Sequence, residues 1–148
     1  IYMEALFSDG YLVKLDTNGN RPGVLKELVE AGLVDYVAMD IKNSKEKYPM
    51  TCGVDELDIS PVIRSVNYLL ENHVDYEFRT TVVKELHTPQ DIVDISIWIK
   101  NAKKYFLQGF IDSGDILNGK FNGYDENNMK NLLKLTLDYV EHAEIRGF

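Results

Sequence analysis

Cysteine is almost absent from this 148-residue sequence, which has only Cys52 and therefore cannot form an internal disulfide framework. Such scarcity is typical of proteins from a reducing compartment. No apolar run approaches the roughly 20 residues that a membrane-spanning helix needs, and the first residues lack the basic and apolar pattern of a secretion signal. From these absences we expect a cytoplasmic protein with no membrane contact.

Positive charge is also scarce. The sequence has 16 Lys and Arg against 24 Asp and Glu, and the net charge of -8 argues against binding nucleic acid through a broad basic surface. The three histidines, at positions 73, 87 and 142, are too scattered to predict a metal site. What remains is ordinary for a soluble globular protein, with 45% apolar and 27% charged residues. We expect a single domain covering residues 1–148.

Short apolar segments alternate with amphipathic ones along the chain. Strands are predicted at 11–16, 33–42, 75–83 and 105–110, and the tail at 144–148 can add a short one. The end of a helix is predicted at 1–9, and further helices at 22–31, 60–70, 89–102 and 125–142; the segment 43–59 is interpreted as polar and irregular. Prolines and a capping box at 88–91 mark several helix starts. This alternation predicts repeated βα units and a parallel sheet.

Three of the predicted strands carry charges on one face. Because alternate side chains of a strand point the same way, the charged pairs share a face within each strand: Lys14 and Asp16, Asp40 and Lys42, and Glu77 and Arg79. A doubly wound sheet has helices on both faces and would exclude them. We therefore predict an α/β fold, a parallel-stranded partial (β/α) barrel with helices outside and a polar cavity inside. The first strand should expose apolar surface around Leu12.

Four charged residues fall near strand C-termini, the end at which ligands bind in parallel α/β folds: Asp16, Asp40, Lys42 and Arg79. Lys and Arg suit a ligand carboxylate or phosphate, and aspartates suit an amine, a ribose diol or a cation. A zwitterionic, ribose-bearing ligand would use both kinds. The alternative is an ionic network without function, in which these charges satisfy one another.

Other polar features are interpreted as structural. His87 is expected in a loop without a catalytic role, because no nucleophile pattern accompanies it. Cys52 has no partner that would make it reactive. Asn18-Gly19 is expected to be a plain turn, and the acidic loop at 112–126 lacks the spacing of a calcium loop.

Four segments in this order and spacing together resemble one family: LVKLDTNGN at 12–20, LVDYVAMDIK at 33–42, YEFRTTVV at 76–83 followed by LHT, and YFLQGF at 105–110. They resemble the radical S-adenosylmethionine (radical SAM) enzymes that activate glycyl radical enzymes. The similarity is greatest to the activating protein of anaerobic ribonucleoside-triphosphate reductase, with pyruvate formate-lyase activating enzyme as a relative. The fold that this resemblance implies is a radical SAM (β/α)6 partial barrel.

The resemblance also implies cofactor-binding residues. Asp16 and Thr17 match an Asp-Thr pair near S-adenosylmethionine and a monovalent cation, and Asp40 matches an aspartate beside the same cation. Lys42 matches a lysine that meets the carboxylate of the cofactor's methionine part. Arg79 matches an arginine of the cofactor pocket.

The family's Cys-x3-Cys-x2-Cys motif, which binds a [4Fe–4S] cluster, is missing. We therefore expect a C-terminal portion that lacks about 80 residues, or two βα units, and that contains no catalytic residue and is inactive alone. The full-length enzyme is called the parent enzyme below. The resemblance implies that the parent enzyme makes a 5′-deoxyadenosyl radical, and that this radical abstracts a hydrogen from a glycine of a partner enzyme. That partner is a glycyl radical enzyme of the anaerobic ribonucleotide reductase or pyruvate formate-lyase type, and flavodoxin or ferredoxin supplies the electron.

Two other functions stay open at this point. One is a non-catalytic, barrel-like module that binds a nucleotide-like ligand or a partner protein. The other is an ordinary barrel enzyme of small-molecule metabolism that uses an Asp/Lys acid–base pair.

Overall fold

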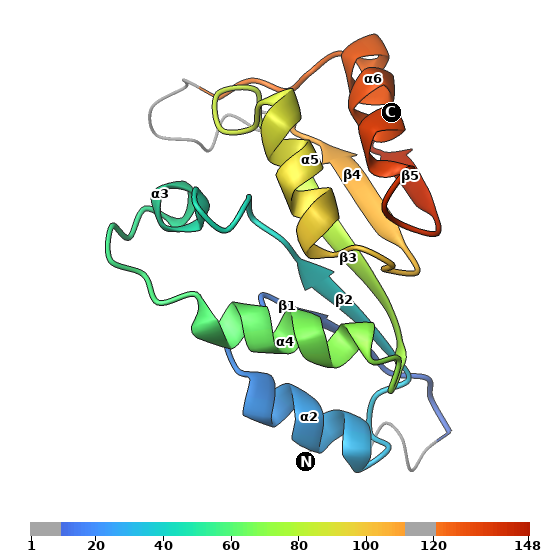
Figure 1. Cartoon of the computed structure of the whole chain (residues 1–148). Helices are drawn as coiled ribbons and strands as arrows, with labels where there is room; N and C mark the ends of the chain where they lie inside the picture. Colours follow the sequence, from blue (N-terminus) through green and yellow to red (C-terminus); the bar gives the residue numbers. More distant parts are fainter. Residues whose placement is uncertain (1–9, 112–120) are drawn as a thin grey trace.

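The computed structural model describes residues 10–111 and 121–148, and within them one five-stranded sheet (Figure 1). The strands are β1 (Lys14–Thr17), β2 (Tyr36–Asp40), β3 (Asp75–Val82), β4 (Tyr105–Gly109) and β5 (Ala143–Arg146). All neighbouring strands are parallel, and their order in the sheet follows the chain. The predicted helix end at 1–9 and residues 112–120 of the acidic loop lie outside the described residues.

The helices are α2 (Pro22–Glu30), α3 (Tyr48–Cys52), α4 (Ser60–Leu70), α5 (Pro89–Trp98) and α6 (Glu126–Thr136). A proline stands in the first turn of α2, α3, α4 and α5, where its missing N–H costs no helical hydrogen bond. The capping box predicted for α5 is present, because Thr88 and Asp91 each accept a backbone N–H of the other. No helix in the described ranges is both long and apolar enough to cross a membrane.

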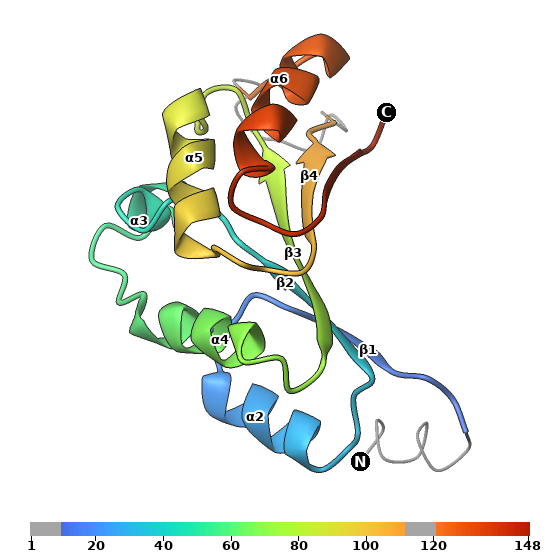
Figure 2. The same cartoon turned by 45° about the vertical axis from the view of Figure 1, so that its right-hand side comes forward.

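The strand order explains why helices cover only one face. Right-handed crossovers between successive neighbouring strands place every connecting helix on the same side of the sheet. Figures 1 and 2 show α2, α4, α5 and α6 on that one side. A doubly wound sheet would reverse its strand order and cover both faces. The predicted α/β fold, a parallel partial barrel, is therefore confirmed.

The hydrophobic core fills the space between this covered face and the helices. Strand side chains that point toward the helices are fully buried, among them Val37, Met39, Phe78 and Leu107. They pack with buried helix residues such as Val66, Leu69, Ile92 and Ile95. Truncating a side chain of this kind to alanine typically costs about 2–5 kcal/mol of stability. Most buried apolar strand residues therefore lie on the face toward the helices, and the charged strand residues lie on the other face.

Several element boundaries differ from the sequence prediction; for example, α5 ends at Trp98 rather than near residue 102. The segment 43–59 contains the short helix α3, which ends at Gly53 in a left-handed conformation with φ of 73°. β1 begins at Lys14 rather than at residue 11, and Leu12 is 87% exposed as predicted. The last helix ends at Thr136 rather than near residue 142, and Leu137, directly after it, is half exposed.

Candidate functional site

An ionic cluster lies on the uncovered face at the C-terminal ends of β1, β2 and β3. Asp40 is the direct register partner of Arg79, and Asp16 pairs with Ala38 two residues earlier on β2, so their side chains share a face. Nη2 of Arg79 lies 3.2 Å from Oδ1 of Asp40, and Nη1 lies 3.8 Å from Oδ1 of Asp16. Nζ of Lys42 lies 3.5 Å from Oδ2 of Asp40. The structure thus brings together four of the five predicted site residues.

Arg79 is the central member of this cluster and the most buried. Its side chain is only 14% exposed, against 36% for Asp40 and 63% for Asp16. Its Nε is buried and has no hydrogen-bond partner within the part of the chain that the structure describes. Buried donors are nearly always paired, so the unpaired Nε–H is unusual. The neighbouring aspartates leave this donor of Arg79 unused.

Thr17, the fifth predicted residue, is placed differently. It pairs with Met39 in the register, on the face that the helices cover, and its hydroxyl accepts the N–H of Gly19 at 3.0 Å. Gly19 has a φ of 76°, and a Cβ there would overlap the Met39 side chain. Ser65 donates to the Gly19 carbonyl at 2.7 Å. The Thr17 side chain therefore fixes the predicted turn and does not join the ionic cluster.

Two hollows adjoin Lys42 at this end of the sheet. One has a volume of about 170 Å³ and is lined by Asp40, Lys42 and Arg79, with Thr81, Leu86 and His87 among the rest. The other measures about 230 Å³, and its lining includes Asn18, Asn20, Lys42, Tyr48 and Cys52. The Lys42 side chain is 46% exposed, and Lys42 lines both hollows.

A second ionic group lies further toward the N-terminal ends of the strands and is closed. The buried carboxylate of Glu77 receives Arg146 at 2.9 and 3.4 Å and the Tyr36 hydroxyl at 2.9 Å. The Arg146 guanidinium stacks on Phe106, 3.5 Å from the ring centroid. Burial and the hydrogen bond to the anionic Glu77 raise the pKa of Tyr36, which stays a neutral donor. Glu77 therefore belongs to an ionic network in which the charges are paired with one another, as in the alternative given above for the charged strand residues.

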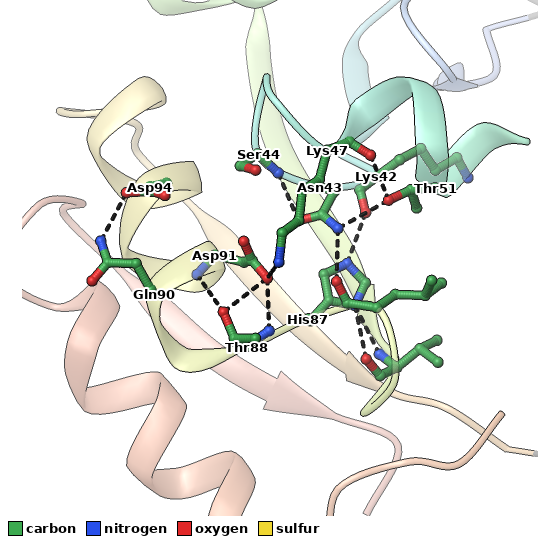
Figure 3. A network of polar contacts seen from close by, with 12 residues as sticks. Lys42, Asn43, Ser44, Lys47, Thr51, His87, Thr88, Gln90, Asp91 and Asp94 are labelled. Atoms are coloured by element: carbon green, nitrogen blue, oxygen red, sulfur yellow. Dashed lines mark hydrogen bonds and ion pairs between the residues drawn. The ribbon is translucent and has the colours of Figure 1, made fainter. Parts of the chain in front are cut away.

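Behind Lys42, His87 is buried and forms hydrogen bonds with both ring nitrogens (Figure 3). The Val83 N–H donates to Nδ1 at 2.9 Å, so the proton must be on Nε2, which donates to the Lys42 carbonyl at 2.8 Å. Burial lowers the pKa of His87, which keeps the ring neutral. The prediction of a loop residue without a catalytic role did not anticipate this link to Lys42.

The other peptide group of Lys42 is held by Tyr48. Its hydroxyl accepts the Lys42 N–H at 3.1 Å and lies 3.5 Å from the Asp40 carbonyl, to which it donates. Burial raises the pKa of Tyr48 to about 12. Asn43, also buried, donates to the Leu86 carbonyl at 2.9 Å. The segment after β2 is thus attached to the turn after β3.

A partly buried ion pair connects the same two segments further along the chain. Nζ of Lys47 lies 2.7 Å from Oδ2 of Asp91, which also accepts from the N–H and hydroxyl of Thr88 (Figure 3). Burial alone would raise the pKa of Asp91, but the hydrogen bonds from Lys47 and Thr88 lower it. The carboxylate therefore stays ionised and serves two purposes, as helix cap and as anchor for the segment after β2.

The described residues do not fit an iron–sulfur cluster. A [4Fe–4S] cluster needs several cysteine thiolates, and the sequence has one cysteine, Cys52, which is exposed. No group of three or more His, Cys, Asp or Glu in the described ranges could hold a metal ion. Asp16 and Asp40 both face Arg79, so the predicted monovalent-cation site has no support.

Comparisons with known proteins agree with this fold. No protein-family model matches the chain. A protein of Methanocaldococcus jannaschii, provisionally named as a glycyl-radical enzyme activating enzyme, is 33% identical over 143 residues. A crystallised domain of pyruvate-formate lyase-activating enzyme from Bacteroides vulgatus superimposes with a TM-score of 0.77. The superposition covers 99% of this chain and 88% of the crystallised domain. The sequence identity is 13%, so the likeness concerns the fold alone.

Fold and side-chain geometry together define a partial-barrel α/β protein with an ionic cluster at its strand C-termini. The likeness to these two proteins supports the radical S-adenosylmethionine family of glycyl-radical-enzyme activating enzymes as the family of this chain. The match to the M. jannaschii relative takes in 93% of this chain but 59% of that protein.

Proposed function

We propose that this chain is the C-terminal, cofactor-positioning part of a radical SAM activating enzyme. The parent would generate a glycyl radical on a partner of the anaerobic ribonucleotide reductase or pyruvate formate-lyase type. The observation that carries the proposal is the meeting of Asp40, Lys42 and Arg79 at the C-terminal ends of parallel strands. The name of the M. jannaschii relative supports the same activity.

The residues present fit S-adenosylmethionine. The Lys42 ammonium would pair with the carboxylate of the methionine part, and Asp16 or Asp40 would take up the amine or the ribose hydroxyls. Arg79, whose Nε has no acceptor among the described residues, would bind a further oxygen. When bound, S-adenosylmethionine supplies the radical chemistry of the family. The protein's own contribution is to bind and orient it.

The cluster ligands would have to come from residues that this sequence does not contain. We therefore expect the 148-residue chain alone to bind S-adenosylmethionine and to be inactive. An electron donor such as flavodoxin or ferredoxin, the oxidoreductase class and a cytoplasmic location all belong to the parent enzyme in this proposal.

The second candidate is a non-catalytic module that binds a nucleotide-like ligand. The single cysteine favours this candidate over a chain that is catalytically active by itself, because one cysteine cannot hold the cluster. The two candidates differ in what the ionic cluster recognises. A cofactor site of the family needs the amino-acid carboxylate that Lys42 would bind, whereas a nucleotide module needs only the nucleoside or a phosphate.

Isothermal titration calorimetry of the chain separates them. We expect saturable binding of S-adenosylmethionine and at least tenfold weaker binding of adenosine, ATP and the decarboxylated analogue, since each lacks the carboxylate. Binding of ATP or adenosine as tight as that of S-adenosylmethionine would favour the nucleotide module. No heat change with any of the four compounds would refute both candidates.

A further inference from the structure

Lys42 stands just beyond the end of β2, where the regular strand pairing ends. The residue before it is still tied to β3, because Ile41 donates its N–H to the Arg79 carbonyl at 2.7 Å and accepts the Thr80 hydroxyl at 2.8 Å. The peptide groups of Lys42 itself bond to side chains. Tyr48 accepts its N–H and His87 donates to its carbonyl.

Both side chains are rigidly placed. Tyr48 is 2% exposed and packs edge-on against Trp98, with ring centroids 6.0 Å apart. His87 is 1% exposed, and its carbonyl accepts the Tyr124 hydroxyl at 2.6 Å. The main chain of Lys42 is thus held from two sides by buried groups, while its side chain is 46% exposed and the residue lines both hollows.

His87 has no polar atom left for a ligand. Nδ1 is occupied by the Val83 N–H and Nε2 by the Lys42 carbonyl. Any effect of this histidine on ligand binding must therefore pass through the position of Lys42. The Lys47–Asp91 pair and Asn43 fasten the surrounding segments (Figure 3), so the turn that carries His87 is fixed relative to Lys42.

We infer that His87 is a positioning residue, which holds the main chain of Lys42 through its Nε2–H so that the ammonium meets the carboxylate of a zwitterionic ligand. This inference rests on the proposed function. The two hydrogen bonds of the His87 ring have different roles in this inference. The bond to Val83 fixes the tautomer and supports the fold, whereas the bond to Lys42 serves the ligand site.

Two variants separate these consequences. In His87→Gln the side-chain amide reaches the place of Nε2 and can donate to the Lys42 carbonyl, but the acceptor for Val83 is lost. In His87→Asn the side-chain oxygen takes the place of Nδ1 and can accept from Val83, but the donor to Lys42 is lost. Each variant forfeits one buried hydrogen bond, so we expect similar decreases in the urea midpoint.

Calorimetric titration of the full chain with S-adenosylmethionine measures the difference. We expect His87→Asn to bind about tenfold more weakly than the unaltered chain, and His87→Gln to stay within about twofold. Decarboxylated S-adenosylmethionine is the control ligand. It lacks the group that Lys42 would bind, so the two variants should bind it alike.

The outcomes are distinguishable. If the unaltered chain binds S-adenosylmethionine but the two variants bind it equally, the positioning role is refuted and the proposed function stands. A loss in His87→Asn that is equal for the decarboxylated ligand would also refute it, since the damage would then be general. If the unaltered chain does not bind S-adenosylmethionine, the proposed function fails and this inference fails with it.

Discussion

Arg79 and Asp40 are direct partners in the register of β3 and β2, and Nη2 of Arg79 lies 3.2 Å from Oδ1 of Asp40. They lie on the face that no described helix covers. Nη1 of Arg79 also lies 3.8 Å from Oδ1 of Asp16. This arginine therefore joins the carboxylates of two different strands.

Replacement of Arg79 by Met should affect both stability and binding. Asp16 and Asp40 would lose their shared cation, and we expect a loss of about 1–3 kcal/mol in the free energy of unfolding, because the guanidinium is largely buried. Affinity for S-adenosylmethionine should fall at least tenfold. Urea denaturation and calorimetry measure the two effects. Arg64→Met, which removes an exposed cation of α4, is the control and should change neither.

Replacement of Arg146 by Leu should be costly for a different reason. Glu77 would remain buried without its cation, and breaking such a pair typically costs about 3–5 kcal/mol. The double variant with Glu77→Gln should recover much of that loss, because no buried charge remains. Urea denaturation of the two single variants and the double variant measures the coupling. Purely additive effects would contradict the closed network described for Glu77.

The buried His87 predicts a pH dependence of stability. Burial lowers its pKa in the folded state, whereas the unfolded chain takes up the proton near pH 6.5. Stability from this group is therefore complete above about pH 7 and is lost as the pH falls below about 6.5. Urea denaturation at pH 7.5 and 5.5 should show the decrease, and His87→Gln should show a smaller one. An equal decrease in both proteins would assign the effect to other groups.

Anaerobic incubation with iron and sulfide should not give a stoichiometric [4Fe–4S] cluster in this chain. One cysteine cannot replace the several thiolate ligands that such a cluster needs. The absorbance near 400 nm measures the outcome. A full cluster signal that survives Cys52→Ala would contradict the assignment of the chain to the cofactor-positioning part.

Much of the fold follows from local patterns in the sequence. The apolar run that ends in Asp40 and Lys42 predicted β2 and its ionic face, and the Thr88-Pro89 start predicted α5. Thr17 was placed with the site by resemblance, although strict alternation along β1 already puts its side chain on the face opposite to Asp16. That signal was available in the sequence.

The parts that the sequence did not predict depend on long-range contacts. The positioning role of His87 depends on its hydrogen bonds with Val83 and Lys42. Lys42 is distant in the sequence, and only the fold brings it close to His87. The pairing of Lys47 with Asp91 is of the same kind. Helix α3 was missed because it is a single short turn of helix, ended by Gly53, in a segment rich in polar residues. No periodic pattern can indicate contacts of these kinds.

The central claim is that Asp16, Asp40, Lys42 and Arg79 form the S-adenosylmethionine site, and nuclear magnetic resonance of the ¹⁵N-labelled chain tests it most directly. On titration with S-adenosylmethionine, saturable shifts should concentrate in the amides of these four residues and their neighbours. Lys42→Ala should weaken the response at least tenfold and change stability by less than about 0.5 kcal/mol, as expected for a half-exposed side chain. Lys45→Ala, an exposed lysine outside the cluster, should bind normally. Saturable shifts that lie elsewhere, or that Lys42→Ala leaves unchanged, would contradict the account.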